Sequence, residues 1–248
     1  MDRSELARLN SAALEDMTSD IEFWSAEPIF AGQTVFCLAS GPSLTREVAD
    51  QVRGRPTIVV NSSCGLAPWS TVLFFTDCSW YEARRQLVAD WQGNVATMCK
   101  RAKRELAEKV WLIKTCGDPD LPCEFPPVGS GLVRQGRSSG HTAISLAIAA
   151  GAARVVLLGY DCRVVLDASG LPREHCHDEY LVDGRRDYAT EKEDPRWNNK
   201  RDYSAIFVPG YRGWNDAAAR AGVQILNATP GSAITEFDMV DLVDILKG

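Results

Sequence analysis

Small polar residues recur where apolar runs of the chain end, and their types suit the binding of a phosphate or a nucleotide. Hydroxyl, amide and backbone N–H groups bind phosphate oxygens, and glycine lets a ligand approach the backbone closely. Such groups follow apolar runs in four places and open a small-residue helix in a fifth: Ser40-Gly41-Pro42-Ser43, Asn61-Ser62-Ser63, Thr76-Asp77, Gly159-Tyr160-Asp161 and Ser138-Ser139-Gly140-His141. We therefore expect them to line one cleft.

Each group also has a simpler interpretation. The loop at 40–43 is neither a P-loop nor a GxGxxG motif, so it is either a plain strand-to-helix turn or a loop that offers N–H groups to a phosphate. The start of the helix at 138–140 is either an N-cap or a clamp for phosphate or carboxylate. Asn61 either caps a helix or bonds to a base, a ribose or a phosphate.

The elements that must position these groups follow from hydrophobic periodicity. Continuous apolar runs predict buried strands, and spacings of three to five predict amphipathic helices. The expected strands are 34–44, 56–63, 70–77, 94–101, 110–117, 154–161 and 223–229, and the expected helices are 4–25, 80–91, 102–109, 138–153, 211–222 and 234–248. Strands that alternate with helices and are apolar throughout predict a mostly parallel sheet covered on both faces, and such sheets bind ligands at the carboxyl ends of their strands.

Two segments interrupt this alternation. Residues 117–137 are rich in Pro and Gly and are expected to form a loop. Residues 162–203 are charged and weakly periodic, and they are too long for an ordinary connection, so we interpret them as an inserted lid. No linker divides the chain. We predict a single Rossmann-like α/β domain over residues 1–248.

Composition excludes several classes of function. The 248 residues carry 27 Lys and Arg against 33 Asp and Glu, a net charge of -6, which argues against non-specific binding of nucleic acid or anionic membranes as the main role. No apolar run is long enough to span a bilayer, and the polar N-terminus does not resemble a signal peptide. The eight cysteines form no CxxC pair, so we expect reduced, mostly buried thiols in a cytoplasmic protein and no zinc site.

The landmarks together resemble one superfamily. The combination of strand-GPSL, strand-NSS, strand-TD with a nearby Trp, SSG at the start of an Ala-rich helix, and VVLLGYD is similar to a superfamily of glycosyltransferases. It includes the bacterial sialyltransferases of lipooligosaccharide synthesis and the motility-accessory-factor glycosyltransferases that modify flagellin. The resemblance covers residues 33–80 and 130–248, including the tail VQILNATPGSAITEF.

The resemblance implies transfer of a sugar from a nucleotide-sugar donor, with no metal required. It places the donor against Ser40 to Ser43, the SSGH helix start and the Gly-Tyr-Asp strand end, with Asn61, Ser62 and Asp77 alongside. The catalytic base of the sialyltransferase-like enzymes is a lid histidine, which here corresponds to His175 or His177. Tyrosine hydroxyls neutralise the leaving phosphate in such enzymes, and Tyr160 is our first candidate for this role. The acceptor class stays open and includes a modified nucleotide or a DNA base.

One departure and two alternatives remain. The sequence has Ala39 and Ser40 where the sialyltransferases usually have Gly and Asn, so the donor base need not be cytidine. The 6-hydroxymethylpterin pyrophosphokinase-like proteins share the GPSL and G-x-D landmarks but transfer diphosphate from ATP. On that alternative Asp77 and Asp161 become the natural magnesium ligands. The third possibility is a non-catalytic nucleotide-binding module.

Overall fold

The apolar runs at 34–38, 57–60, 72–75 and 154–158 become neighbouring strands of one parallel sheet. A computed structural model of the chain describes residues 21–118, 121–163, 165–166, 172–173, 175–176, 181–182, 185–186 and 203–247. The described strands are β1 (Thr34–Leu38), β2 (Thr57–Val60), β3 (Val72–Phe75), β4 (Asn94–Thr97), β5 (Val110–Leu112), β6 (Lys114–Cys116), β7 (Leu132–Arg134), β8 (Arg154–Leu158), β9 (Val165–Leu166), β10 (Pro172–Arg173), β11 (Leu181–Val182), β12 (Arg185–Arg186), β13 (Gln224–Asn227) and β14 (Asp238–Met239).

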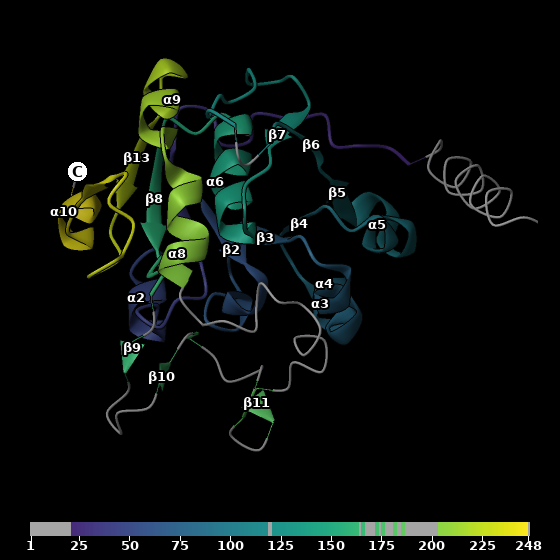
Figure 1. Cartoon of the computed structure of the whole chain (residues 1–248). Coiled ribbons are helices and arrows are strands. Elements are labelled where there is room, and N and C mark those ends of the chain that lie inside the picture. The colour runs from purple at the N-terminus through teal and green to yellow at the C-terminus, as the bar shows by residue number, and fades with distance from the viewer. Residues whose placement is uncertain are drawn as a thin grey trace, which may run out of the picture.

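Short helices connect these strands (Figure 1). The described helices are α2 (Arg46–Asp50), α3 (Cys78–Ala83), α4 (Arg85–Asp90), α5 (Lys100–Leu106), α6 (Ser139–Ala149), α8 (Tyr203–Phe207), α9 (Trp214–Arg220) and α10 (Leu242–Lys247), with the 3-10 turns η1 (Asn61–Gly65), η2 (Ala107–Lys109) and η4 (Val208–Tyr211). Asn61 begins η1 in the left-handed region, at φ 50°, which asparagine tolerates better than most residues.

The order of strands in the sheet places a reversal at its centre. The eight strands lie in the order β14-β13-β8-β1-β2-β3-β4-β5, and every pairing given for them is parallel. From β1 the chain builds outward through β5, and then β8 returns to the other side of β1. The crevice at the carboxyl ends of β1 and β8 is therefore the topological switch point, where open α/β sheets bind their ligands. The predicted Rossmann-like α/β fold with a mostly parallel sheet is confirmed.

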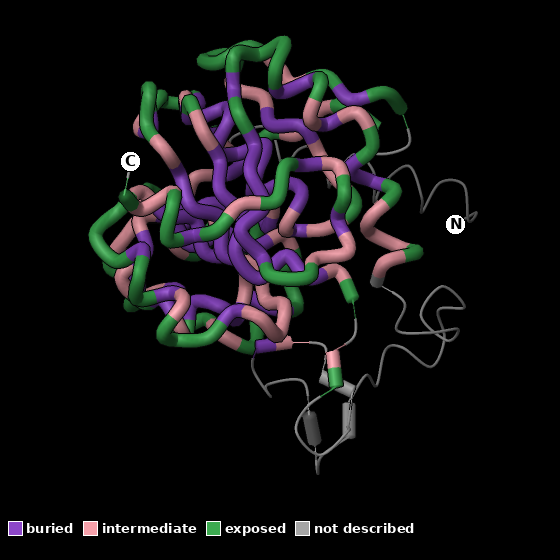
Figure 2. The backbone as a smooth tube through the Cα atoms, turned by 90° about the vertical axis from the view of Figure 1, so that its left-hand side faces the viewer, coloured by how far each residue is buried: buried purple, intermediate pink, exposed green. Residues whose placement is uncertain are grey.

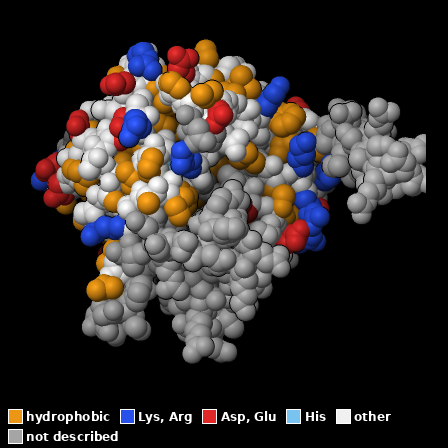
Figure 3. All heavy atoms as spheres, in the orientation of Figure 1, with side chains coloured by type: hydrophobic (Ala, Val, Ile, Leu, Met, Phe, Trp, Pro, Cys, Tyr) orange, Lys and Arg blue, Asp and Glu red, His pale blue; other side chains and the backbone are white. Residues whose placement is uncertain are grey.

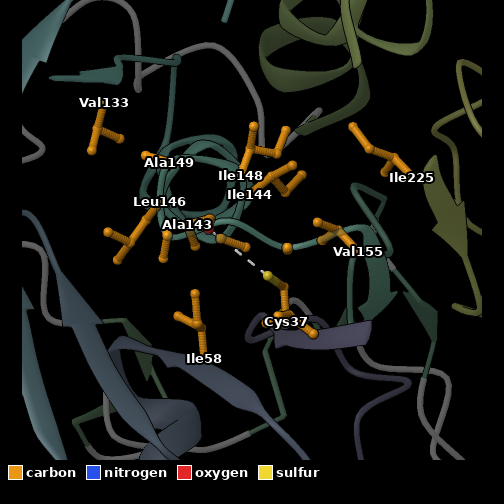
Figure 4. Close-up of a cluster of buried hydrophobic side chains, with 14 of the residues drawn as sticks. Cys37, Ile58, Val133, Ala143, Ile144, Leu146, Ile148, Ala149, Val155 and Ile225 are labelled. Carbon is orange, nitrogen blue, oxygen red and sulfur yellow. Dashed lines mark hydrogen bonds between the residues drawn. The ribbon is translucent and has the colours of Figure 1, made fainter. Parts of the chain in front are cut away.

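Both faces of the sheet are buried, as continuous apolar strands require. In β1, Val35 and Cys37 belong to one core cluster with α6 and α9, whereas Phe36 and Leu38 belong to a second cluster with α2, α3 and α10. Figure 4 shows Cys37, Ile58 and Val155 directed toward α6, with the Cys37 thiol 3.8 Å from the Ala143 carbonyl oxygen. Buried residues accordingly run through the centre of the molecule in Figure 2, and exposed residues lie at its margins.

Several expected elements differ in detail. The loop predicted at 117–137 contains β7, which pairs with β6 in a small parallel sheet. The helix predicted at 80–91 is two helices, α3 and α4, that meet at Arg84, and the strand predicted at 110–117 is divided into β5 and β6 at Ile113. The helix predicted at 234–248 was wrong in its first half, because β14 extends the sheet edge before α10 begins.

Two predictions fall largely on residues that the structure does not describe. Of the helix expected at 4–25, only 21–25 are described, and they are not helical. Trp24 within them is buried and stacks on Trp111, with ring centroids 5.3 Å apart. Within the expected lid at 162–203, the described residues include two short antiparallel pairs, β9 with β10 and β11 with β12.

Candidate functional site

A buried carboxylate joins the two strand ends at the switch point. Asp161, two residues beyond Gly159, is 2% exposed. Its two carboxylate oxygens accept hydrogen bonds from the Ser43 backbone N–H, at 3.2 and 3.3 Å, and Oδ2 accepts one from the Ser43 hydroxyl at 2.7 Å. Burial raises the pKa of Asp161, and the bonds from Ser43 oppose that rise. The loop after β1 and the segment after β8 are thus held together by side chains 118 positions apart in the sequence.

Glycine is required where these two segments touch. The N–H of Gly41 donates to the Gly159 carbonyl oxygen at 2.8 Å. A Cβ at position 41 would lie 2.1 Å from Asp161 Oδ2 and 2.4 Å from the Gly159 carbonyl oxygen. Gly159 has φ +71°, and its Cβ would lie 2.5 Å from the Ala39 carbonyl oxygen. The contact between the GPS loop and the Gly-Tyr-Asp segment therefore depends on the absence of a side chain at both positions.

This arrangement changes the expected role of the GPS loop. We expected N–H groups of this loop to meet a phosphate, but those of Gly41, Ser43 and Leu44 donate to Gly159, Asp161 and Gly41 respectively. Pro42 has no N–H to offer. The Ser43 N–H and hydroxyl are bonded to the Asp161 carboxylate, so in this structure the loop binds a carboxylate of the chain itself rather than offering these groups to a phosphate.

The start of α6 lies against the same site through polar contacts. Ser138 is the N-cap, and its hydroxyl accepts from the His141 N–H at 3.4 Å. The Ser139 hydroxyl lies 2.7 Å from the Thr76 hydroxyl, which links α6 to the end of β3. Gly140 faces the Tyr160 ring, where a Cβ would lie 3.1 Å from a ring carbon. Thr76 was expected to line the cleft together with Asp77, and its contact with Ser139 brings it to the start of α6.

Tyr160 acts as a support for α6. It is 2% exposed, and its hydroxyl donates to the Gly140 carbonyl oxygen at 3.0 Å. Burial raises its pKa well above the usual tyrosine range, so the phenol stays protonated. This position suits a positioning residue better than the phosphate-binding role that we expected.

The loop after β13 also supports Tyr160, through residues that sequence reasoning missed. The Tyr160 N–H donates to the Thr229 hydroxyl at 3.0 Å, and the Ser232 hydroxyl donates to the Tyr160 carbonyl oxygen at 2.6 Å. The Ala233 N–H donates to the Asp161 carbonyl oxygen at 2.9 Å. The signal for these contacts was the small polar run NATPGS directly after an apolar strand.

We expect Tyr160→Phe to lower the free energy of unfolding by about 1 kcal/mol, because the Gly140 carbonyl loses its donor. Chemical denaturation measures this change. Tyr81→Phe is the matched control, since the Tyr81 hydroxyl donates to Glu105 away from the switch point, at 2.7 Å. If Tyr160→Phe and the unmodified protein are equally stable, the bond from Tyr160 to Gly140 does not contribute to the stability of the fold.

His141 lies in the core rather than in the cleft. It is fully buried, its ring stacks on Tyr211 with centroids 3.7 Å apart, and the edge of Trp214 lies against it. Burial lowers the pKa of His141 to about 3, and the positive charge of Arg137 acts in the same direction. The predicted contact of His141 with a donor is therefore indirect at most, through the Ser138 hydroxyl 2.8 Å from its Nδ1.

The end of β2 contributes one unsatisfied polar atom. The Asn61 side-chain oxygen is buried and has no hydrogen-bond partner within the described part of the chain. Ser62 is buried, and its hydroxyl accepts from the Trp80 indole N–H at 2.9 Å. Asn61 thus fits a ligand N–H group, whereas Ser62 holds α3 against the sheet.

The residues proposed for magnesium on the diphosphokinase alternative are in different surroundings. Asp77 is exposed and caps the start of α3 without a side-chain bond to its backbone, whereas Asp161 is buried against Ser43. Among the described residues, no group of three or more His, Cys, Asp or Glu side chains could hold a metal ion.

One of the two candidate bases is described, and it lies at the β1 loop. His175 Nδ1 is 3.4 Å from the Ser40 hydroxyl, and the Cys176 N–H donates to the Ser40 carbonyl oxygen at 2.8 Å. Residues 175 and 176 therefore lie against Ser40 at the switch point. His177 lies outside the described residues.

The cysteines depart from the expectation of reduced thiols. The structure describes all eight; Cys78 and Cys99 form a disulfide, and the other six are thiols. Four of these six thiols are buried, as expected. The spacing of 21 residues between Cys78 and Cys99 gave no sign of their pairing.

No protein-family model, no curated protein and no solved structure matches the chain. Within the described residues, no helix combines the length and the apolar character that a membrane crossing needs. The site is therefore defined by its own contacts at the switch point: Asp161 bonded to Ser43, His175 beside Ser40, and, at the end of β2, the Asn61 side-chain oxygen that is unpaired among the described residues.

Proposed function

We propose that the chain is a glycosyltransferase that moves a sugar from a nucleotide-sugar donor to an acceptor hydroxyl. The observation that supports this proposal best is the position of His175, 3.4 Å from Ser40 at the carboxyl end of β1. A titratable base beside the switch-point crevice is what transfer to a hydroxyl group needs.

In this proposal the donor lies over the GPS loop, and the α6 start and Asn61 hold its nucleotide. Glycosyl transfer forms a bond between the acceptor oxygen and the anomeric carbon while the bond to the nucleotide phosphate breaks. The acceptor proton passes to His175 or His177, and the leaving phosphate needs neutralisation by hydrogen-bond donors. Because the N–H groups of the GPS loop are already bonded, we assign phosphate contact to groups that line the crevice, such as the Ser40 hydroxyl.

The acceptor and the compartment belong to the proposal as well. A modified nucleotide or a DNA base is one acceptor class that the resemblance leaves open. On the face drawn in Figure 3, Lys and Arg side chains are interspersed with Asp and Glu, which is a surface of mixed charge rather than a continuous basic stripe. We place the activity in the cytoplasm, because six of the eight cysteines are thiols.

A thermal-shift screen with CMP, UDP, GDP, ADP and ATP, each with and without magnesium, tests the donor. A ligand at about 100 times its Kd adds roughly 2.7 kcal/mol to the free energy of unfolding. We expect a metal-independent rise in Tm with CMP or with a nucleoside diphosphate. A rise with ATP and magnesium only would favour the diphosphokinase instead, and no rise with any nucleotide would contradict both.

Substitution of the two lid histidines tests the base. With the donor class identified, we expect alanine at the true base, His175 or His177, to lower the rate of nucleotide release from the donor by roughly 10²- to 10⁴-fold. Donor affinity should change little, because the base meets the acceptor rather than the nucleotide. Each variant is the control for the other, since only one of the two should show the loss. Full rates in both variants would exclude a histidine base in this lid, and affinity without turnover in the unmodified protein would indicate a binding module.

A further inference from the structure

The Cys78–Cys99 disulfide joins two loops at the carboxyl edge of the sheet. Cys78 is the first residue of α3, three positions after the last residue of β3, and Cys99 is the N-cap of α5, two positions after the last residue of β4. Their Cα atoms are 5.2 Å apart, within the range that a disulfide spans without movement of the backbone. The other six cysteines of the chain are thiols, so this bond is not part of a general disulfide framework.

The two cysteines of the pair differ in exposure as residues. Cys78 is exposed, whereas Cys99 is 1% exposed. Disulfides are opened by a thiolate that attacks one sulfur while the other leaves, and an exposed sulfur is the one that can be reached. Because Cys78 is the exposed residue of the pair, we expect a reductant in solution to attack at Cys78.

Cys78 is also tied to the candidate site by its neighbours. Thr76, two residues earlier, bonds to Ser139 at the start of α6. Trp80, two residues later, donates its indole N–H to Ser62 at the end of β2. A change in the position of 76–80 would therefore act on two of the loops that we assign to the donor.

We propose that the Cys78–Cys99 pair is a redox switch that orders the segment 76–80, which includes the start of α3, when oxidised and loosens it when reduced. Its effect on ligand binding rests on the proposed function of the site, but the switch itself does not. A dithiol is the reductant: one thiolate attacks Cys78 Sγ, the Cys78–Cys99 bond breaks, and Cys99 leaves as a thiolate that takes up a proton. The second thiol of the reductant then forms its own disulfide and releases Cys78 as a thiol, so two electrons pass from the dithiol to the protein.

Thiol counting and hydrogen exchange test the switch without any nucleotide. After mild oxidation, we expect mass spectrometry of alkylated protein to find a Cys78–Cys99 cross-link and two thiols fewer than after reduction with dithiothreitol. Reduction should lower the Tm by roughly 5–10 °C, because the closed loop of the unfolded chain is released. It should also speed amide exchange in 76–80 more than in β1, since local order depends on local contacts.

Matched variants separate this switch from a general effect of reductant. Cys78→Ser should behave as the reduced protein under both conditions, whereas Cys116→Ser, at a half-buried thiol outside the pair, should keep the full response. If Cys78→Ser still responds to dithiothreitol as the unmodified protein does, or if oxidation yields no cross-link, the switch is refuted.

The affinity for nucleotide, measured in the oxidised and the reduced protein, tests whether the switch acts on the site. With the nucleotide that raises the Tm in the screen, we expect reduction to weaken the affinity by about three- to tenfold, the cost of ordering one or two additional side chains on binding. Unchanged affinity alongside altered hydrogen exchange would refute the link to the site. If no nucleotide binds in either redox state, the proposed function fails, and the cross-link and exchange measurements still decide the switch.

Discussion

Gly41→Ala is expected to destabilise the fold by about 3 kcal/mol and to abolish nucleotide binding at the switch point. The new methyl group would lie 2.1 Å from Asp161 Oδ2 and 2.4 Å from the Gly159 carbonyl oxygen. The second of these is a backbone atom of the segment after β8, which cannot rotate away. The GPS loop must therefore separate from that segment, and the bonds from Ser43 to the buried Asp161 would be lost with it.

Denaturation by guanidinium measures the first part of this expectation, and the nucleotide screen measures the second. Gly65→Ala is the matched control, because a Cβ at Gly65 would meet no atom within 4 Å. We expect the control to lie within about 0.5 kcal/mol of the unmodified protein. A Gly41→Ala protein of normal stability that still binds nucleotide would show that the two segments do not need their close contact.

The centre of the fold was predictable because its signals are local. A strand buried on both faces is apolar along most of its length. The run VLFF is apolar throughout, and TVFCL, TIVV and RVVLL are apolar after their first residue. The polar residues after each run then fall at one edge of the sheet by geometry alone. For this reason the crevice could be located before any contact within it was known.

The contacts within the crevice could not be predicted in the same way. Nothing near Ser43 indicates that its N–H donates to Asp161, because the two residues are 118 positions apart and meet only through the order of the strands. His141 carried the same ambiguity: its place in SSGHT is compatible with a donor contact, but Tyr211 and Trp214 cover its ring from a distant helix and turn.

Short elements were missed for a different reason. β7 has three residues inside a segment rich in Pro and Gly, and β14 has two residues before a helix, so neither offers a full period of any pattern. Both are fixed by pairing with β6 and β13 respectively. The Cys78–Cys99 disulfide was missed for a similar reason, because the two cysteines meet only through the pairing of β3 with β4.

The buried neutral His141 predicts that stability falls as the solution is acidified below about pH 6.5. Burial lowers its folded pKa to about 3, whereas a histidine in the unfolded chain titrates near 6.5. Above pH 6.5 both states are neutral and the group adds no pH dependence. Between 6.5 and about 3 the unfolded state binds a proton that the folded state does not, so the free energy of unfolding falls by about 1.4 kcal/mol per pH unit.

Denaturation at pH 7.5 and pH 5.5 measures this slope. We expect the unmodified protein to lose about 1.4 kcal/mol between the two from this group alone, and we expect His141→Gln to lose that much less. Ser145→Ala is the control, because Ser145 is also buried in α6 and its replacement removes no titratable group, so the slope should stay in place. Equal slopes in His141→Gln and the unmodified protein would show that His141 binds a proton as readily in the folded state as in the unfolded chain.

NMR gives a second readout that does not depend on a stable variant. The imidazole signals of His141 should stay constant down to about pH 4, because its ring is covered by Tyr211 and bonded to the Ser138 hydroxyl. The neutral His141 ring is bonded to Ser138, and Ser138 caps the helix that begins with Ser139 and Gly140. The loss of stability in acid and the position of the α6 start therefore both depend on an uncharged His141.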